Sequence, residues 1–100
     1  MTRADVRRYV VAYDIPDDRR RASIAKALQA FGDRIQFSVF VVDAGPAQMQ
    51  RLRIRLEELM KAREDSVLVL DLGPLELAQA KRFTYLGVGR PVTDATSFIV

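Results

Sequence analysis

The sequence contains no cysteine and no histidine, and these two absences exclude several kinds of chemistry. Without cysteine there are no disulfides, no thiolate metal sites and no thiol nucleophile. Without histidine the chain lacks the commonest general base, the usual zinc ligand and any catalytic triad that depends on an imidazole. A hydrolytic site in this chain would therefore need another means of activating water, and a bound metal ion is one.

The sequence also lacks long hydrophobic runs. No apolar stretch approaches the roughly 20 residues of a membrane span, and the N-terminus shows no signal-peptide pattern. We therefore expect a cytoplasmic protein that makes no contact with a membrane. The 100 residues predict a single domain over 1–100 with an ordinary globular composition, 49% apolar and 29% charged. A domain of this size buries only roughly 60–70% of its unfolded surface, so a partner would add stability.

The positive charge comes mainly from arginine. The formal net charge is +3, and thirteen of the sixteen basic residues are arginines. The planar guanidinium group matches phosphate better than the lysine ammonium does. The arginines could bind phosphate, or they could simply form a solvated surface, which is the simpler explanation. Their positions have to decide between these two explanations.

The stretch from Tyr9 to Arg21 organises the chain. An apolar run rich in β-branched and aromatic residues predicts a buried strand over Tyr9–Ile15, with Asp14 near its carboxyl end. Pro16 then turns the chain, and an aspartate is available to cap the helix that follows. Three arginines occupy the first turn of that helix, where cations oppose the helix dipole, so local helix stability does not explain them. An acid beside clustered guanidinium groups suits a divalent cation and a phosphate.

The apolar periodicity predicts an alternation of strands and helices. The expected elements are a strand over Tyr9–Ile15, a helix over Asp18–Phe31, two strands within Asp33–Ala44 separated at Ser38, a helix starting near Gly45 and a strand over Val67–Leu70. This order is that of an α+β ferredoxin-like sandwich, βαββαβ, with both helices on one face of an antiparallel sheet. Glu76–Tyr85 is ambiguous, because Ala78–Lys81 favours a helix and Phe83–Leu86 favours a strand, and Phe98–Val100 is expected on an edge as an extra C-terminal strand.

The predicted strands are apolar on both faces, which has a consequence for assembly. An antiparallel sheet covered by helices on one side normally shows alternating apolar and polar residues. Here the strand segments Tyr9–Tyr13, Val39–Val42 and Val67–Leu70 do not alternate. We therefore expect the second face to be covered by another copy of the chain, in a two-fold homodimer packed through the sheets.

Two segments resemble the second CRISPR-associated (Cas) protein family. They are Tyr13-Asp14-Ile15, with the arginines that follow it, and Gly32-Asp33-Arg34-Ile35-Gln36-Phe37-Ser38-Val39-Phe40. The family consists of small adaptation proteins described as metal-dependent endoribonucleases. The resemblance implies a ferredoxin-like homodimer in which the strand-end acids of both subunits meet to hold Mg²⁺. It also implies a role in spacer acquisition, as the central dimer that bridges two dimers of the Cas integrase.

The resemblance also assigns site residues. It makes Asp14 the ligand of Mg²⁺, with Mn²⁺ as a substitute, and places Tyr13, Arg21, Arg34 and Phe40 at positions that the family associates with the catalytic site. Each assignment has a structural alternative. The acid could simply close its strand, the phenylalanine could be a core residue, and Arg34 could pair with a neighbouring aspartate, Asp33 or Asp43. Ser23 stands where other members carry a further arginine.

Two groups of arginines are candidates for contacts with nucleic-acid phosphates. They are Arg19, Arg20 and Arg21 at the start of the first helix, and Arg51 and Arg55, with Arg53 between them, on the second. A helix N-terminus already offers amide donors to anions, and the second group forms a basic patch suited to a duplex backbone. The alternative is a solvated helix surface balanced by Glu57 and Glu58.

These observations leave three hypotheses about function. The first is Mg²⁺-dependent phosphodiester hydrolysis, as an endoribonuclease or a DNase. The second is a non-catalytic scaffold that holds duplex DNA for the Cas integrase. The third is a toxin-type ribonuclease of a related fold. The sequence does not decide between single-stranded RNA and duplex DNA as the substrate.

Overall fold

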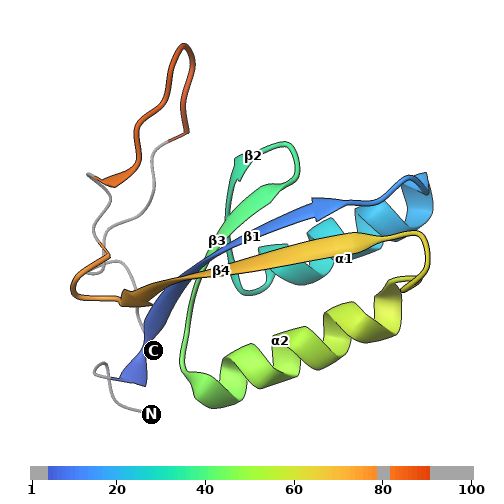
Figure 1. Cartoon of the computed structure of the whole chain (residues 1–100), viewed down its shortest axis with the longest axis horizontal. Helices are drawn as coiled ribbons and strands as arrows, with labels where there is room; N and C mark the ends of the chain where they lie inside the picture. The colour runs from blue at the N-terminus through green and yellow to red at the C-terminus, as the bar shows by residue number, and fades with distance from the viewer. Residues whose placement is uncertain (1–4, 79–81, 91–100) are drawn as a thin grey trace.

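The computed structural model describes residues 5–78 and 82–90 and contains a four-stranded antiparallel sheet (Figure 1). Its elements are β1 (Arg7–Asp14), α1 (Asp18–Gln29), β2 (Gly32–Gln36), β3 (Val39–Ala44), α2 (Pro46–Leu59) and β4 (Ser66–Pro74). The strand order is β2-β3-β1-β4, so β1 and β3 are central and β2 and β4 form the edges. Both helices lie on the same side of the sheet, which we call the helix face (Figure 1). The predicted ferredoxin-like sandwich is confirmed.

The main core fills the space between the helices and the sheet. Its fully buried members include Val11, Ile24, Leu28, Phe40, Val42 and Leu52. These residues come from β1, β3 and both helices, at the spacings of two and of three or four residues that each element requires. The core therefore fixes the central strands against the helices and holds the end of β1 in place.

Helix α1 starts and ends where local interactions require it. The side chain of Asp17 accepts a hydrogen bond from the backbone nitrogen of Arg20 at 2.9 Å, so it is the N-cap that the sequence offered. The helix stops at Gln29, two residues before the expected end at Phe31. The chain enters β2 at Gly32, where an added Cβ would overlap the carbonyl oxygen of Val41. Only glycine allows β2 to begin this close to β3.

The turn between β2 and β3 lies at Phe37 and Ser38, where the sequence predicted a break. The β2–β3 pairing slips by one residue between Arg34 and Gln36, which is a β-bulge. Beyond the last β1–β3 pair, the backbone nitrogen of Tyr13 donates to the carbonyl oxygen of Ser38 at 3.0 Å. The turn is therefore joined to the end of β1.

The opposite side of the sheet, which we call the second face, is covered in part by the chain itself. Phe83 and Tyr85, which follow β4, pack with a small cluster formed by Val10, Ile35, Val39 and Val41. The β4 half of this face remains open, since Leu68 is 62% exposed and Leu70 is 51% exposed. The homodimer stays a prediction, and the surface that would need covering is now limited to this half.

Strand boundaries differ from those predicted, for an identifiable reason. β1 begins at Arg7, not Tyr9, and ends at Asp14, not Ile15, while β4 extends beyond Val67–Leu70 at both ends. Arg8 is polar, which suggested a lead-in segment, but its side chain is only 1% exposed because it pairs with Asp43. Buried ion pairs of this kind are invisible to a pattern of apolar residues.

The C-terminal predictions fall partly outside the described residues. The described residues 83–86 do not form a strand, so the strand alternative is wrong, whereas the helix alternative falls mostly on residues 79–81, outside the described residues. The expected extra strand at Phe98–Val100 lies outside the residues that the structure describes. Within the described ranges, no helix has the length and apolar character that crossing a membrane requires.

Candidate active site

Asp14 is exposed at the last position of β1. Its backbone pairs with Ser66 at the start of β4 on one side, and the turn at Phe37 and Ser38 lies on the other. The alternation along β1 puts Asp14 on the second face with Ala12. Among the hydrogen bonds and ion pairs of the described residues, none involves the Asp14 carboxylate. The structural alternative, an acid that binds turn amides, therefore has no support in this part of the chain, and the carboxylate is available to a ligand.

An aromatic and arginine cluster stands beside this acid, on the helix face. The ring of Tyr13 stacks with that of Phe40, with centroids 6.3 Å apart, and the Tyr13 hydroxyl donates to the carbonyl oxygen of Phe37 at 3.3 Å. The guanidinium carbon of Arg34 lies 5.2 Å from the centroid of the Phe40 ring and 6.0 Å from that of Phe37. The four side chains therefore form one connected cluster, to which β1, β2, β3 and the turn each contribute one residue.

Arg34 lies against aromatic rings, and no ion pair among the described residues joins it to a carboxylate. Asp43, one of its proposed partners, instead binds Arg8 at 2.7 Å. The Nε atom of Arg34 is buried with no hydrogen-bond partner in the structure. A guanidinium lying over aromatic faces gains a cation–π attraction and keeps its N–H donors. Phe40 is fully buried, so it can contribute only by packing against Arg34 and Tyr13.

The three arginines of the first turn of α1 have different surroundings. Arg20 binds Asp65 through two hydrogen bonds, from Nε to Oδ2 at 2.7 Å and from Nη2 to Oδ1 at 3.0 Å. Arg21 donates to the carbonyl oxygen of Ile15 at 2.9 Å and pairs with Asp18. Arg19 is exposed and takes part in none of the ion pairs among the described residues.

The Arg20–Asp65 pair fixes α1 to the segment that leads into β4. The Asp65 side chain is completely buried, and it also accepts a hydrogen bond from the backbone nitrogen of Lys61 at 2.8 Å. The hydrogen bond from Arg20 lowers the pKa of Asp65, and the same bond raises the pKa of Arg20. This pair explains why an arginine is present in the first turn despite the helix dipole. Because Arg20 is so engaged, Arg19 is the better placed of the two for a phosphate.

The acids near Asp14 are already in use. Asp17 caps α1, and the hydrogen bond from the backbone of Arg20 lowers the pKa of its carboxyl group. Asp18 is paired with Arg21. In the part of the chain that the structure describes, no group of three or more acidic residues is placed to hold a metal ion. A single chain therefore offers one free carboxylate at this site, which is too few for Mg²⁺ unless water or a second chain supplies the other oxygen ligands.

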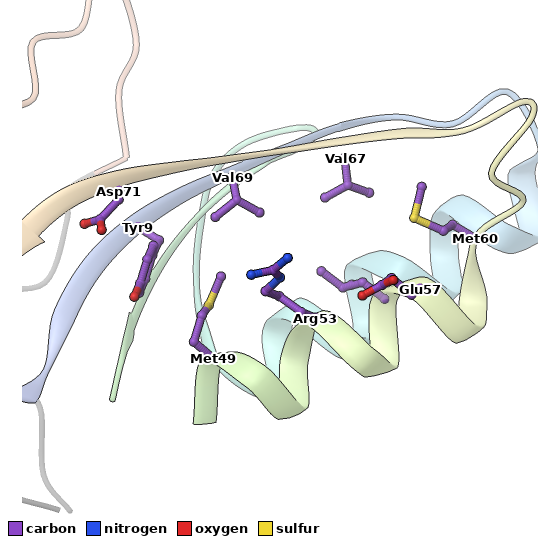
Figure 2. Close-up of a pocket in the computed structure, with 9 residues that line it drawn as sticks. Tyr9, Met49, Arg53, Glu57, Met60, Val67, Val69 and Asp71 are labelled. Atoms are coloured by element: carbon purple, nitrogen blue, oxygen red, sulfur yellow. The ribbon is translucent and has the colours of Figure 1, made fainter. Parts of the chain in front are cut away.

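The outer surface of α2 carries the second arginine group. Arg51, Arg53 and Arg55 are all exposed, and Arg55 lies 3.8 Å from Glu58, a separation that counts for little at a solvated surface. Arg53 also borders a groove of about 570 Å³ between α2 and β4 (Figure 2). Figure 2 shows that this groove has methionine and valine side chains along it, with Asp71 at the end near Tyr9.

Two features of the site were not identified from sequence. The motif that contains Phe37 gives this residue no role, whereas in the structure Phe37 is 71% exposed and its ring lies against Arg34. A large aromatic residue placed at the turn between two strands was the available signal. The role of Asp65 was also missed, because no local pattern relates it to an arginine that lies 45 residues away.

Comparison with known proteins gives a consistent result. A family model described as CRISPR associated protein Cas2 matches residues 7–79. A Thermus thermophilus protein named CRISPR-associated endoribonuclease Cas2 is 42% identical over 81 residues, which cover 81% of this chain and 86% of that protein. A Synechocystis protein named CRISPR-associated endoribonuclease Cas2 3 is 41% identical over 71 residues, covering 71% of this chain and 77% of its own length.

Solved structures show the same similarity. The crystal structure of a hypothetical protein from Thermus thermophilus superimposes with a TM-score of 0.76 at 34% sequence identity, covering 88% of this chain and 99% of that one. The crystal structure of Streptococcus pyogenes Cas2 superimposes with a TM-score of 0.70 at 27% identity, covering 80% of this chain and 99% of that one.

Proposed function

Since this chain belongs to the CRISPR associated protein Cas2 family, we propose that it is a nuclease of a CRISPR system that hydrolyses phosphodiester bonds with Asp14 at its centre. The observation that carries the proposal is the exposed carboxylate of Asp14 at the end of β1, which has no partner among the described residues. The guanidinium group of Arg34 lies over the ring of Phe40, which stacks with Tyr13, the residue before Asp14. Family membership argues against the alternative of a toxin-type ribonuclease, and we place the activity in the cytoplasm, with the nucleic acids of the CRISPR system.

We propose Mg²⁺, or Mn²⁺ in its place, as the cofactor. A bound Mg²⁺ would lower the pKa of a coordinated water and neutralise charge on the scissile phosphate, which matters in a chain without histidine. Asp14 is the residue that would hold it. Because one carboxylate is too few, we propose that the Asp14 side chains of two subunits share the ion.

The open half of the second face supports such a homodimer. Leu68 and Leu70 are exposed there, next to Val10 and Ala12 of β1 in the strand register. Asp14 is on this same face, at the end of the strand. A two-fold packing of the second faces would cover the leucines and bring the two acids towards the symmetry axis.

The chain's own residues have separate tasks in this proposal. Arg34 would donate hydrogen bonds to the phosphate of the bond to be cleaved, because its position over the rings fixes its orientation. Tyr13 holds the turn at Phe37 in place through its hydroxyl group. Arg21, bound to the carbonyl oxygen of Ile15, positions the loop after β1. Arg19 is free to contact a neighbouring phosphate.

Cleavage of labelled single-stranded RNA and duplex DNA, with Mg²⁺ and with a chelator, tests this function. We expect Asp14→Asn to lower the rate of metal-dependent cleavage by at least about 100-fold, which is the scale of a catalytic group's contribution. Glu76→Gln removes another exposed carboxylate and serves as the matched control. Light scattering on each variant establishes whether the dimer persists. Metal-dependent cleavage that survives Asp14→Asn in an intact dimer would contradict the proposal.

The exposed arginines of α2 favour a second role. Arg51 and Arg53 make no ion pair with any described residue, which suits contacts with a duplex backbone. We propose that the homodimer also serves in spacer acquisition, holding duplex DNA for a Cas integrase. Integration assays with that integrase separate the two roles. Asp14→Asn would spare integration if the scaffold role dominates, whereas Arg51→Ala combined with Arg53→Ala would reduce it.

A further inference from the structure

The ring of Phe37 is exposed on a rigid support. It is 71% exposed, whereas Phe40 two residues into β3 is fully buried. The backbone of the turn that carries this ring is hydrogen-bonded to β1. The carbonyl oxygen of Phe37 accepts the Tyr13 hydroxyl at 3.3 Å, and that of Ser38 accepts the Tyr13 backbone nitrogen at 3.0 Å. A large apolar ring is thus held in solvent by two hydrogen bonds from the central strand.

Arg34 supports one side of this ring. Its guanidinium carbon lies 6.0 Å from the Phe37 centroid, and no hydrogen bond among the described residues involves its side-chain nitrogens. The bulge between Arg34 and Gln36 lies next to the turn, and bulges of this kind re-aim side chains beside binding sites. An aromatic ring with an unpaired guanidinium beside it offers a π face for a base and N–H donors for a phosphate.

We propose that Phe37, supported by Arg34, is a stacking site for one unpaired nucleobase of a single-stranded nucleic acid, whose backbone then passes Asp14. The last pair of the β1–β3 ladder is Ala12 with Val39, and the Tyr13 nitrogen then donates to Ser38, so the turn residue Phe37 is level with Asp14 along the chain. Stacking on an aromatic ring accepts every base, so the site selects strandedness and not sequence. The bases of an intact duplex are already stacked and cannot occupy it.

This inference rests on the proposed function, since it assumes that a nucleic acid reaches the end of β1, and it specifies the substrate as single-stranded. The ring is separate from the exposed leucines of the proposed dimer contact. The turn joins β2 and β3, whereas the exposed leucines of the second face lie on β4, across β1 in the sheet (Figure 1).

The chain contains no tryptophan, which allows a direct test. Phe37→Trp introduces a single tryptophan at the proposed site, whose fluorescence can be excited selectively over that of the tyrosines. We expect a single-stranded oligonucleotide to quench its fluorescence. An abasic oligonucleotide of the same length, which has the same backbone charge, should leave the fluorescence nearly unchanged. Equal quenching by both oligonucleotides, or by neither, would overturn the stacking site.

Affinity measurements on the full chain provide the second readout. We expect Phe37→Leu, which keeps an apolar side chain but loses the ring, to weaken binding of single-stranded RNA by about 5- to 150-fold. Binding of a duplex with the same sequence should change less than about twofold by the same reasoning. Leu77→Ala is the matched control, because Leu77 is 61% exposed, and it lies after β4.

The possible results separate this inference from the function on which it rests. Asp14-dependent cleavage that is unaffected by Phe37→Leu would overturn the stacking site and leave the nuclease intact. Equal losses of single-strand and duplex affinity, or a change in the mass of the dimer, would show that the ring supports the fold or an interface and would also overturn it. A wild-type protein that binds no oligonucleotide would overturn both proposals.

Discussion

At the start of β1, Arg7 and Arg8 are paired with aspartates, whereas Asp14 at its end has no side-chain partner among the described residues. The guanidinium group of Arg8 is buried, donates to both carboxylate oxygens of Asp43 at 2.7 and 2.9 Å, and donates to the carbonyl oxygen of Ala78 at 2.9 Å. Asp14, the last residue of β1, is exposed and takes part in no ion pair among the described residues. Arg34 faces the rings of Phe37 and Phe40 and takes part in no ion pair among the described residues.

The difference shows how one strand serves two purposes. A buried charge must be paired, because an isolated one is too costly to desolvate, so Arg8 can only stabilise the fold. A charge left without a partner at the surface adds little to stability and remains available to a ligand. The unpaired end, marked by Asp14, is therefore the candidate site, although the ion pairs of Arg20 and Arg21 lie in the segment just after it.

Breaking the paired end should have the largest effect. Asp43→Ala leaves the buried Arg8 without its carboxylate and should lower the free energy of unfolding by about 3–5 kcal/mol, as measured by urea denaturation. Asp71→Ala removes a comparable aspartate from Arg7, but both side chains of that pair are half exposed, so its cost should stay below about 1 kcal/mol. Similar costs for the two variants would contradict the distinction between buried and exposed pairs.

Removing the charge at the unpaired end should affect activity but not stability. Asp14→Asn should change the free energy of unfolding by less than about 0.5 kcal/mol, because no interaction of the described residues is lost. Cleavage by the same preparation should fall, as proposed above. A large loss of stability would instead mean that the carboxylate has a structural role.

The comparison extends to acid pH through Asp65. The hydrogen bond from Arg20 holds the pKa of Asp65 below its ordinary 3.8, so the unfolded state binds more protons than the folded state in that range. The stabilisation is complete above the unfolded pKa and is lost as pH falls from about 5 through the lower folded pKa. Asp65→Asn should be less stable at neutral pH and should lose less further stability between pH 5 and 2. Thermal melts at several pH values measure this.

A neighbouring acid provides the control for that experiment. Glu64 lies 3.3 Å from the same arginine, but its side chain is 53% exposed. Glu64→Gln should therefore keep nearly the wild-type dependence of melting temperature on pH. If both variants flatten the curve equally, the buried hydrogen bonds of Asp65 are not the cause.

The smallest effect is expected for a change that keeps the charge at the unpaired end. Arg34→Lys retains a cation but loses the planar group that lies over the rings of Phe37 and Phe40. Binding of single-stranded RNA should weaken by about 2- to 5-fold, the scale of an exposed cation–π contact, as measured by fluorescence anisotropy. Full retention of affinity would show that charge alone is sufficient at this position.

Much of the fold was predictable, because the apolar residues follow the periods of the elements that bury them. The turn at Ser38, the cap at Asp17 and the order of strands and helices all follow from local pattern. The extent of β1 did not, because Arg8 is satisfied by a residue on another strand. The part played by Phe83 and Tyr85 on the second face was equally inaccessible, since it depends on where the chain returns after β4.

The candidate site was predictable in part. The sequence identified Asp14 and Arg34, and the structure brings the turn beside the first and two rings against the second. It could not separate Arg19 from Arg20, because their difference depends on a carboxylate distant in the sequence. Adjacent residues with the same chemistry acquire different roles only when the chain folds.

The way α1 is attached at both ends has a mechanical consequence. Its first turn is fixed to the segment before β4 by Arg20 and Asp65, and its last turn is separated from β2 by only Ala30 and Phe31. These two strands are the opposite edges of the sheet. The helix therefore links the two edges of the sheet. A change in twist between the edges would strain either the Arg20–Asp65 pair or the short connection from α1 to β2.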